Sequence, residues 1–372
     1  MKKIFLKNIK SYLLATAFAT TLMVIPQAHA TMAMSDAISA QVASPVGAQM
    51  GGYLTQLNSY DQAFMNMDMF MLSNKKDREA QKEASKINEH GSIWATPFGS
   101  FGTVPVHNGP NVSNTMYGVY VGGDSSLKDL GNGWEGMYGA YAGWNGSRQG
   151  YNNVTMYQNG GTFGLTGMAF KDDFFVGTTI NVGAGAGHIY NNFNNLDNFA
   201  LLSAGIAAKA GYNWELADGK FIIQPSIMTA YSYVHTFDDW NSTGATIDAD
   251  GLHAITVEPG VKFIGNLQHG WQPYAGVSLV YSIMDRTHFR ADNVALPNLS
   301  INPYVKYGFG IRKVWSDRFA GFVQAYFMSG GRNGVGLHGG LRMAIGRDSA
   351  NQVGKGYTPK MESAKISLNN KK

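Results

Sequence analysis

Side chains in one late stretch of the chain alternate between apolar and polar at every second position. In residues 301–315, INPYVKYGFGIRKVW, the odd positions up to 311 are apolar, whereas Lys306 and Arg312 fall at even positions. Because successive side chains of a β-strand point to opposite faces of a sheet, this stretch would have one apolar face and one polar face. Such a strand separates water from an apolar phase.

The same two-residue period recurs along most of the chain. We count about twelve candidate strands, at residues 93–102, 116–123, 134–144, 162–170, 174–188, 201–214, 221–237, 254–265, 271–284, 301–315, 318–328 and 334–346. Most approach or exceed the roughly 9–11 residues of a tilted transmembrane strand, and after residue 30 no stretch approaches the roughly 20 apolar residues of a membrane helix. The sequence therefore predicts an all-β fold, a transmembrane up-and-down antiparallel β-barrel of about twelve strands.

Charged residues in these strands take the face opposite the aliphatic side chains. In residues 254–265, for example, Ile255 and Val257 oppose Glu258 and Lys262. A water-soluble barrel would invert this arrangement, and periodicity alone does not separate the two cases. With lipid outside, a polar and net basic lumen is predicted, faced by Lys209, Glu258, Lys262, Lys306, Arg312 and Arg342.

Connections between the candidate strands alternate in length, which favours lipid outside. Residues 145–161, 189–200 and 238–253 form long connections, whereas 171–173 and 316–317 form tight turns. Outer-membrane barrels combine short periplasmic turns with longer outer loops. Tryptophans near the strand ends agree with this interpretation.

The N-terminus has the features of a secretory signal peptide over residues 1–30. Four lysines flank or precede an apolar segment, and Ala28 and Ala30 form a small-x-small cleavage site. Cleavage there would lower the formal net charge from +4 to zero, which removes the electrostatic case for binding nucleic acid. The chain has no cysteine and only 15% charged residues, against roughly 25% in typical soluble proteins. We expect the protein in the bacterial outer membrane.

Two segments of different character separate the signal peptide from the barrel. Residues 31–73 are small, polar and methionine-rich, and we expect residues 31–56 to be loosely ordered. Residues 74–91 are highly charged and contain no proline or glycine before Gly91, which predicts a polar linker helix. This helix would suit the height of a barrel lumen, and a solvated periplasmic helix is the alternative. The barrel would occupy residues 92–347, followed by a polar basic tail at 348–372.

Several of these segments together resemble the C-terminal translocator barrel of autotransporters (type V secretion). They are WQPYAGVSLVY at 271–281, the series from 301 to 346, and the polar helix ahead of the first strand. The resemblance implies a twelve-stranded barrel that holds the linker helix in its lumen and exports the N-terminal segment to the cell surface. Residues 31–73 are far shorter than a typical passenger, so the exported cargo would be minimal.

The last candidate strand resembles the signal that the outer-membrane barrel assembly machinery reads. Its polar-x-Gly-x-x-apolar-x-apolar spacing is formed by His338, Gly340, Met343 and Ile345. The polar tail departs from the aromatic last residue that is usual in the family. We expect outer-membrane lipid, the general secretion machinery and the barrel assembly machinery as partners of a monomer.

No residue set suggests catalysis, a metal or a cofactor. The nine histidines are scattered without His-x-x-x-His spacing. We therefore predict no enzymatic activity and no cofactor. Two alternatives to the translocator stay open, a porin-like passive channel and a surface-exposed structural or adhesive barrel acting through its outer loops. The basic lumen residues would favour anions in an open pore, or pair with Asp77, Glu79, Glu83 and Glu89 of the linker helix.

Overall fold

The structure is a computed structural model of the 372-residue chain. It describes residues 30–71, 91–105, 111–151, 154–191, 195–237, 247–284, 289–291, 294–295, 301–316 and 319–345. The signal peptide before Ala30, the predicted linker helix up to residue 90 and the C-terminal tail lie outside these residues.

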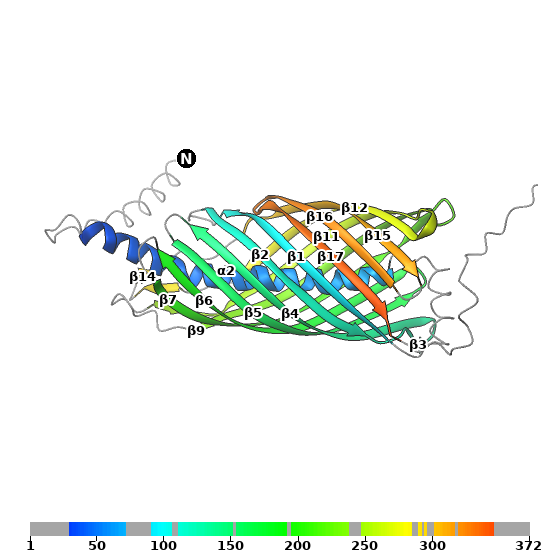
Figure 1. The fold of residues 1–372 in the computed structure, drawn as a ribbon, viewed down its shortest axis with the longest axis horizontal. Helices are drawn as coiled ribbons and strands as arrows, with labels where there is room; N and C mark the ends of the chain where they lie inside the picture. The colour runs from blue at the N-terminus through cyan, green and yellow to red at the C-terminus, as the bar shows by residue number, and fades with distance from the viewer. Residues whose placement is uncertain are drawn as a thin grey trace, which may run out of the picture.

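Twelve antiparallel strands form a closed barrel, so the predicted fold class is confirmed (Figure 1). Each strand pairs with its neighbours in the sequence, and the last strand pairs with the first. Closure leaves no strand edge with unpaired backbone groups, as a bilayer demands. The strands are β1 (Ser92–Pro105), β2 (Asn111–Asp124), β4 (Trp134–Tyr151), β5 (Val154–Lys171), β6 (Phe174–Asn191), β7 (Asn195–Tyr212), β9 (Phe221–Phe237), β11 (Leu252–Gly265), β12 (Trp271–Met284), β15 (Tyr304–Ser316), β16 (Phe319–Gly330) and β17 (Asn333–Ala344).

Short elements mark the two ends of the barrel. At the short-turn end, β3 (Lys128–Gly131) pairs with β4, β8 (Trp214–Leu216) pairs with β9, and η2 (Gln268–Gly270) precedes β12. At the opposite end, two long connections contribute β10 (Ile247–Ala249), β13 (Phe289–Ala291) and β14 (Val294–Ala295), which form a separate small sheet.

The alternation predicted for the strands is visible in their burial. In β15, Val305, Tyr307 and Phe309 are exposed on the outside of the barrel, whereas Tyr304 and Arg312 are buried inside it. Exposed aromatic side chains also gather near the short turns, where the Lys313 ammonium lies 4.6 Å from the ring centre of exposed Trp271. An apolar outer band edged by aromatic residues is typical of a lipid-facing surface.

Two of the predicted long connections are strand instead. Residues 145–161 and 189–200 were expected to form loops, but β4 continues to Tyr151, β5 begins at Val154, and β6 and β7 extend to Asn191 and from Asn195. Described residues of these segments, such as Asn159 and Gly160, lie in ladders whose inward side chains, such as Met156 and Phe199, are buried. The wall from β4 to β7, with 18 residues in each strand, is therefore longer than the wall from β15 to β17, with 12 or 13.

A single long helix, α2 (Ala30–Met71), runs through the barrel and extends beyond its mouth (Figure 1). Residues 31–56 are helical, which corrects the expectation of loose order, and α2 is a lumenal helix ahead of the predicted linker helix, whose residues 74–90 lie outside the described part of the chain. At 42 residues the helix is about 63 Å long, enough to cross a membrane barrel and protrude. Within the described part of the chain, no helix combines the length and apolarity needed to cross a lipid bilayer.

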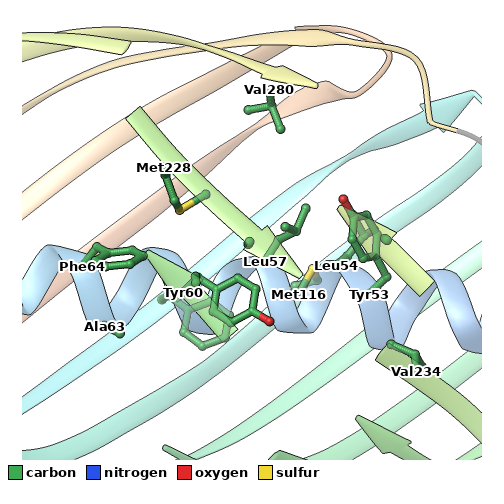
Figure 2. Close-up of a cluster of buried hydrophobic side chains, with 14 of the residues drawn as sticks. Tyr53, Leu54, Leu57, Tyr60, Ala63, Phe64, Met116, Met228, Val234 and Val280 are labelled. Atoms are coloured by element: carbon green, nitrogen blue, oxygen red, sulfur yellow. The ribbon is translucent and has the colours of Figure 1, made fainter. Parts of the chain in front are cut away.

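The part of α2 inside the barrel is buried on all sides. Apolar side chains of the helix, including Tyr53, Leu57, Tyr60 and Phe64, pack against inward residues of several strands (Figure 2). The helix lies mainly against β5, β6, β7 and β9, so mostly on the side of the longer wall. At Gly51 an added Cβ would lie 2.2 Å from Nε2 of Gln149, so a larger residue would have to displace that buried side chain.

The direction of α2 is fixed by contacts at both ends of the barrel. The Gln49 side chain donates a hydrogen bond to the Asp250 carbonyl, in the long connection between β9 and β11. At the other end, Asp68 binds Lys209, which lies near the short-turn end of β7. The N-terminal part of the helix therefore leaves the lumen at the long-connection end, while β1 starts at the short-turn end.

Candidate functional site

Two lysines of the barrel wall bind one carboxylate of the helix. Nζ of Lys209 on β7 lies 3.2 Å from Oδ1 of Asp68, and Nζ of Lys262 on β11 lies 2.5 Å from its Oδ2. The Asp68 side chain is only 7% exposed, and the two lysines remain partly accessible to the lumen. Because α2 supplies the carboxylate and two different strands supply the lysines, these pairs fix the helix in its axial position.

A second cluster lies two helical turns closer to the long-connection end of the barrel. Nζ of Lys306 on β15 lies 3.0 Å from Oδ1 of Asp61 and 2.7 Å from Oε1 of Glu258. Ser278 donates a hydrogen bond to the same Glu258 oxygen at 2.6 Å. Lys306 thus joins the helix to β11, and Glu258 would remain its partner if the helix left.

Charges in the two clusters balance, which differs from the net basic lumen that the barrel strands alone suggest. Three lysines face three carboxylates, two of which come from α2. The expected partners Asp77, Glu79, Glu83 and Glu89 all lie outside the described residues.

Sequence reasoning missed Asp61 and Asp68 because it assigned them to a passenger-like segment. Their separation of seven residues was the available signal, since positions i and i+7 lie on one face of a helix.

Arg342 forms a separate ion pair at the seam where the barrel closes. Its Nη2 lies 2.9 Å from Oδ2 of Asp124, at the end of β2, and donates to Oγ of Ser92 on β1. Arg342 itself belongs to β17, so this group joins three strands across the closing β1–β17 contact. Arg312 is also buried inside the barrel, in register with Gln272 of β12 and Phe322 of β16.

Hydroxyl groups of two tyrosines fix the rotation of α2. The Tyr53 hydroxyl lies 2.7 Å from Oγ1 of Thr256 and 2.6 Å from Oγ of Ser282. The Tyr60 hydroxyl donates to the Tyr231 carbonyl at 2.9 Å. Both tyrosines are fully buried, so each bond forms away from bulk water.

Gly205 has no side chain and so leaves room for the Tyr60 hydroxyl. This gives a test of whether Tyr60 holds α2 in position. A Cβ at Gly205 would lie 1.7 Å from that oxygen, so Gly205→Val must displace Tyr60. We expect the free energy of unfolding in detergent micelles to fall by about 1–3 kcal/mol, as for other overpacked interiors. Gly161→Val is the control, because its Cβ would meet nothing closer than 3.7 Å. Equal stability of the two variants would show that Tyr60 is not held at this place.

A cavity of about 120 Å³ remains between α2 and the strands β11, β12, β15 and β16. Its lining includes both lysine clusters together with Tyr274, Gln324 and Met65. The helix and its contacts therefore fill much of the lumen and leave this polar space beside the ion pairs.

The four residues of the predicted assembly signal, three on β17 and Ile345 just after it, are divided between the inside and the outside of the barrel. His338 is buried in the lumen beside Met65, and an added Cβ at Gly340 would lie 2.2 Å from the Phe322 ring. Met343 and Ile345 are exposed on the outside of the barrel. Of the predicted cleavage residues, Ala28 lies outside the described residues and Ala30 is the first residue of α2.

Within the described ranges, no group of three or more His, Cys, Asp or Glu side chains is arranged to hold a metal ion. What the lumen offers instead is a set of ion pairs and hydroxyl contacts between a barrel and a chain segment that passes through it. This arrangement defines a class of protein, an outer-membrane barrel with a polypeptide segment in its pore.

Comparison with known proteins gives the family. The autotransporter beta-domain family model matches residues 93–325, more than half of the chain, and the chain therefore belongs to that family. It is an outer-membrane translocator barrel of the bacterial cell. No curated protein matches the sequence.

Solved structures of three autotransporters have a similar fold. The beta domain of the Bordetella autotransporter BrkA aligns with a TM-score of 0.56 and 15% identity, over 69% of this chain and 100% of that chain. The transport unit of AIDA-I from Escherichia coli gives 0.58 and 14%, over 69% and 90%. The translocator domain of NalP from Neisseria meningitidis gives 0.52 and 12%, over 76% and 97%. At these identities the likeness concerns the fold alone.

Proposed function

We propose that this barrel displays a short N-terminal segment at the cell surface and then keeps α2 in its lumen as a plug. The observation that carries the proposal is the course of α2, which enters near the short turns and leaves at the long-connection end (Figure 1). If the short turns face the periplasm, as in other outer-membrane barrels, the start of α2 lies outside the cell.

The contacts of α2 suit a segment that stays in place after passage. Asp61 and Asp68 bind three wall lysines, and Tyr53 and Tyr60 bond to β9, β11 and β12. An extended chain passing through the lumen would not match all these positions at once, whereas the folded helix does. A passive open channel is disfavoured because the helix occupies the pore.

The remaining parts of the proposal concern partners and chemistry. We expect a monomer in outer-membrane lipid, delivered by the general secretion machinery and inserted by the barrel assembly machinery. The exposed Met343 on β17 and Ile345 just after it would meet lipid or that machinery during insertion. No enzymatic activity, cofactor or nucleic-acid partner is assigned, and the role of the lumen is passage and retention.

Cysteine labelling in intact cells tests the proposed orientation. The chain has no cysteine, so a single introduced thiol gives an unambiguous signal. Ser39→Cys, on the part of α2 before the barrel mouth, should react with a membrane-impermeant maleimide in intact cells. Lys220→Cys, in the exposed β8–β9 turn, should react only after the outer membrane is permeabilised.

Two results would count against the orientation. Protection of Ser39→Cys in intact cells together with its labelling after permeabilisation would place the N-terminal segment in the periplasm. Labelling of Lys220→Cys in intact cells would place the short turns outside. Either result overturns surface display.

A further inference from the structure

Four strands of the longer wall carry a row of polar and aromatic side chains on the outside of the barrel. Arg148 on β4 is in register with Tyr157 on β5, which is in register with His188 on β6. His188 is in turn opposite Asn198 on β7. All four side chains are exposed, whereas the next residue after Arg148, Gln149, is fully buried on the lumenal side. We call these four residues the outer row.

The outer row lies at the height where the apolar band of a membrane barrel ends. Tyr138 marks the opposite edge near the short turns, where it is 60% exposed and its hydroxyl accepts a hydrogen bond from Lys128 at 3.1 Å. Tyr138 and Arg148 are ten positions apart on β4 (148 − 138). At about 3.3 Å per residue along a strand tilted by about 40°, their heights differ by roughly 25 Å, which matches the apolar band. The outer row is therefore at the level of lipid headgroups.

The charge at this level is basic. Beyond Trp144, no described outward position of β4 to β7 holds an acidic residue, and Arg148 has no ion-pair partner in the described part of the chain. At the short-turn end of β5, by contrast, Lys171 is followed directly by Asp172 and Asp173. The outer row therefore suits an anion that comes from outside the chain.

Neighbouring side chains hold the Arg148 guanidinium in a suitable position for a phosphate. Its Cζ lies 5.5 Å from the centre of the Tyr157 ring, and that ring contacts Tyr190 edge to face at 5.9 Å. A guanidinium over a ring keeps its planar set of N–H donors available, and this set matches the oxygens of a phosphate. Next to them, Nδ1 of His188 donates to Oδ1 of Asn198 at 2.6 Å.

The surface between the outer row and the lipid-facing band changes from small to apolar side chains. One step closer to the short turns, the outward positions are Asn159, Ala186 and Ala200, which are in register across three strands. Their short side chains let a sugar ring approach the wall. Further along, Phe163 and Val182 are paired and are each 52% exposed, as acyl chains require.

We propose that the outer row binds a phosphorylated glycolipid of the outer leaflet. Arg148 donates to a phosphate oxygen, Tyr157 and Asn159 contact the adjoining sugar, and the acyl chains lie over Phe163 and Val182. A charged hydrogen bond at the edge of the apolar phase gives the phosphate its affinity, and the ring and the amide favour a sugar over glycerol. Assignment to the outer leaflet rests on the proposed function, because it requires the short turns to face the periplasm.

Native mass spectrometry of the full-length mature protein in detergent micelles tests the site, with diphosphoryl lipid A as the probe. We expect one tightly bound molecule on the parent protein and affinity at least about tenfold weaker in Arg148→Gln, which removes a charged hydrogen bond. Lys171→Gln is the matched control, because Lys171 lies 6.0 Å from the Trp134 ring centre at the other end of β5. It should keep the parent affinity for lipid A.

The choice of lipid separates a glycolipid site from general attraction to anionic lipid. Phosphatidylglycerol and fully dephosphorylated lipid A should each bind the parent protein at least about tenfold more weakly than lipid A. Equal binding of phosphatidylglycerol, or an equal loss in Arg148→Gln and Lys171→Gln, would overturn the proposal. Heat-modifiable migration in gels verifies that the variants are folded. Because purified protein is used, the result is independent of orientation in the cell, which the labelling of Ser39→Cys and Lys220→Cys tests separately.

Discussion

Asp68→Asn should release the helix from the lumen and open the barrel to ions. The substitution leaves Lys209 and Lys262 without their shared carboxylate in a largely buried position. Breaking a buried ion pair by removing one partner costs roughly 3–5 kcal/mol. We expect the lower end of this range because both lysines keep partial access to the cavity. About 3 kcal/mol corresponds to a rise of roughly 100-fold in the population with the helix displaced.

Single-channel recording in planar bilayers measures this population directly. The parent protein should remain mostly closed, and Asp68→Asn should show frequent large openings. Asp61→Asn should have a smaller effect, because Lys306 keeps Glu258 at 2.7 Å. Asp36→Asn removes the same charge from α2 thirteen residues before Gln49, which contacts the long connection, and should behave as the parent does. A quiet Asp68→Asn channel would mean that the ion pairs do not hold the plug.

Arg342→Met should have the largest effect on the stability of the barrel itself. Arg342 joins β17 to β1 and β2 at the closing seam, and the substitution would leave the Asp124 carboxylate buried beside Ser92 without its partner. Both side chains of the pair are less than 10% exposed. We therefore expect a loss of about 3–5 kcal/mol in the free energy of unfolding.

Denaturant unfolding in micelles, with and without a second substitution, checks this expectation. The double variant Asp124→Asn with Arg342→Met should recover part of the loss, because it no longer buries an unpaired charge. Lys313→Met is the control for a partly exposed cation at the same end of the barrel and should cost less than about 1 kcal/mol. Additive effects of Asp124→Asn and Arg342→Met would show that the two groups do not interact.

The barrel was predictable because the residues of a membrane strand alternate according to whether they face lipid or the lumen. Lipid outside and water or protein inside impose an alternation that is legible in one strand, as Val305, Lys306 and Tyr307 illustrate. The extent of the strands was less predictable. In residues 145–161, asparagine and glycine indicate turns locally, but ladder pairing and packing inside the longer wall keep the described residues of this segment in strand.

The plug was missed because a helix buried on all sides has no polar face. In the lumenal part of α2, Gln56 and Gln62 are as fully buried as Tyr53 and Tyr60. The apolar stripe that identifies a surface helix is therefore absent, and the segment resembles a polar, loosely ordered one. The lumenal helix was instead predicted in the charged segment at 74–91, because local helix signals are strongest there.

The sequence by itself determined the closed sheet, its lipid-facing side and the identity of the wall residues with lumenal charges, since each depends on alternation along one strand. Only the tertiary structure decided which segment fills the pore and how those charges are matched. Asp61 and Asp68 are far in the sequence from Lys209, Lys262 and Lys306, and their pairing depends on the threading of α2 through the barrel. No local pattern encodes that path, because it arises from the shape and charge of a lumen that exists only after twelve strands have closed.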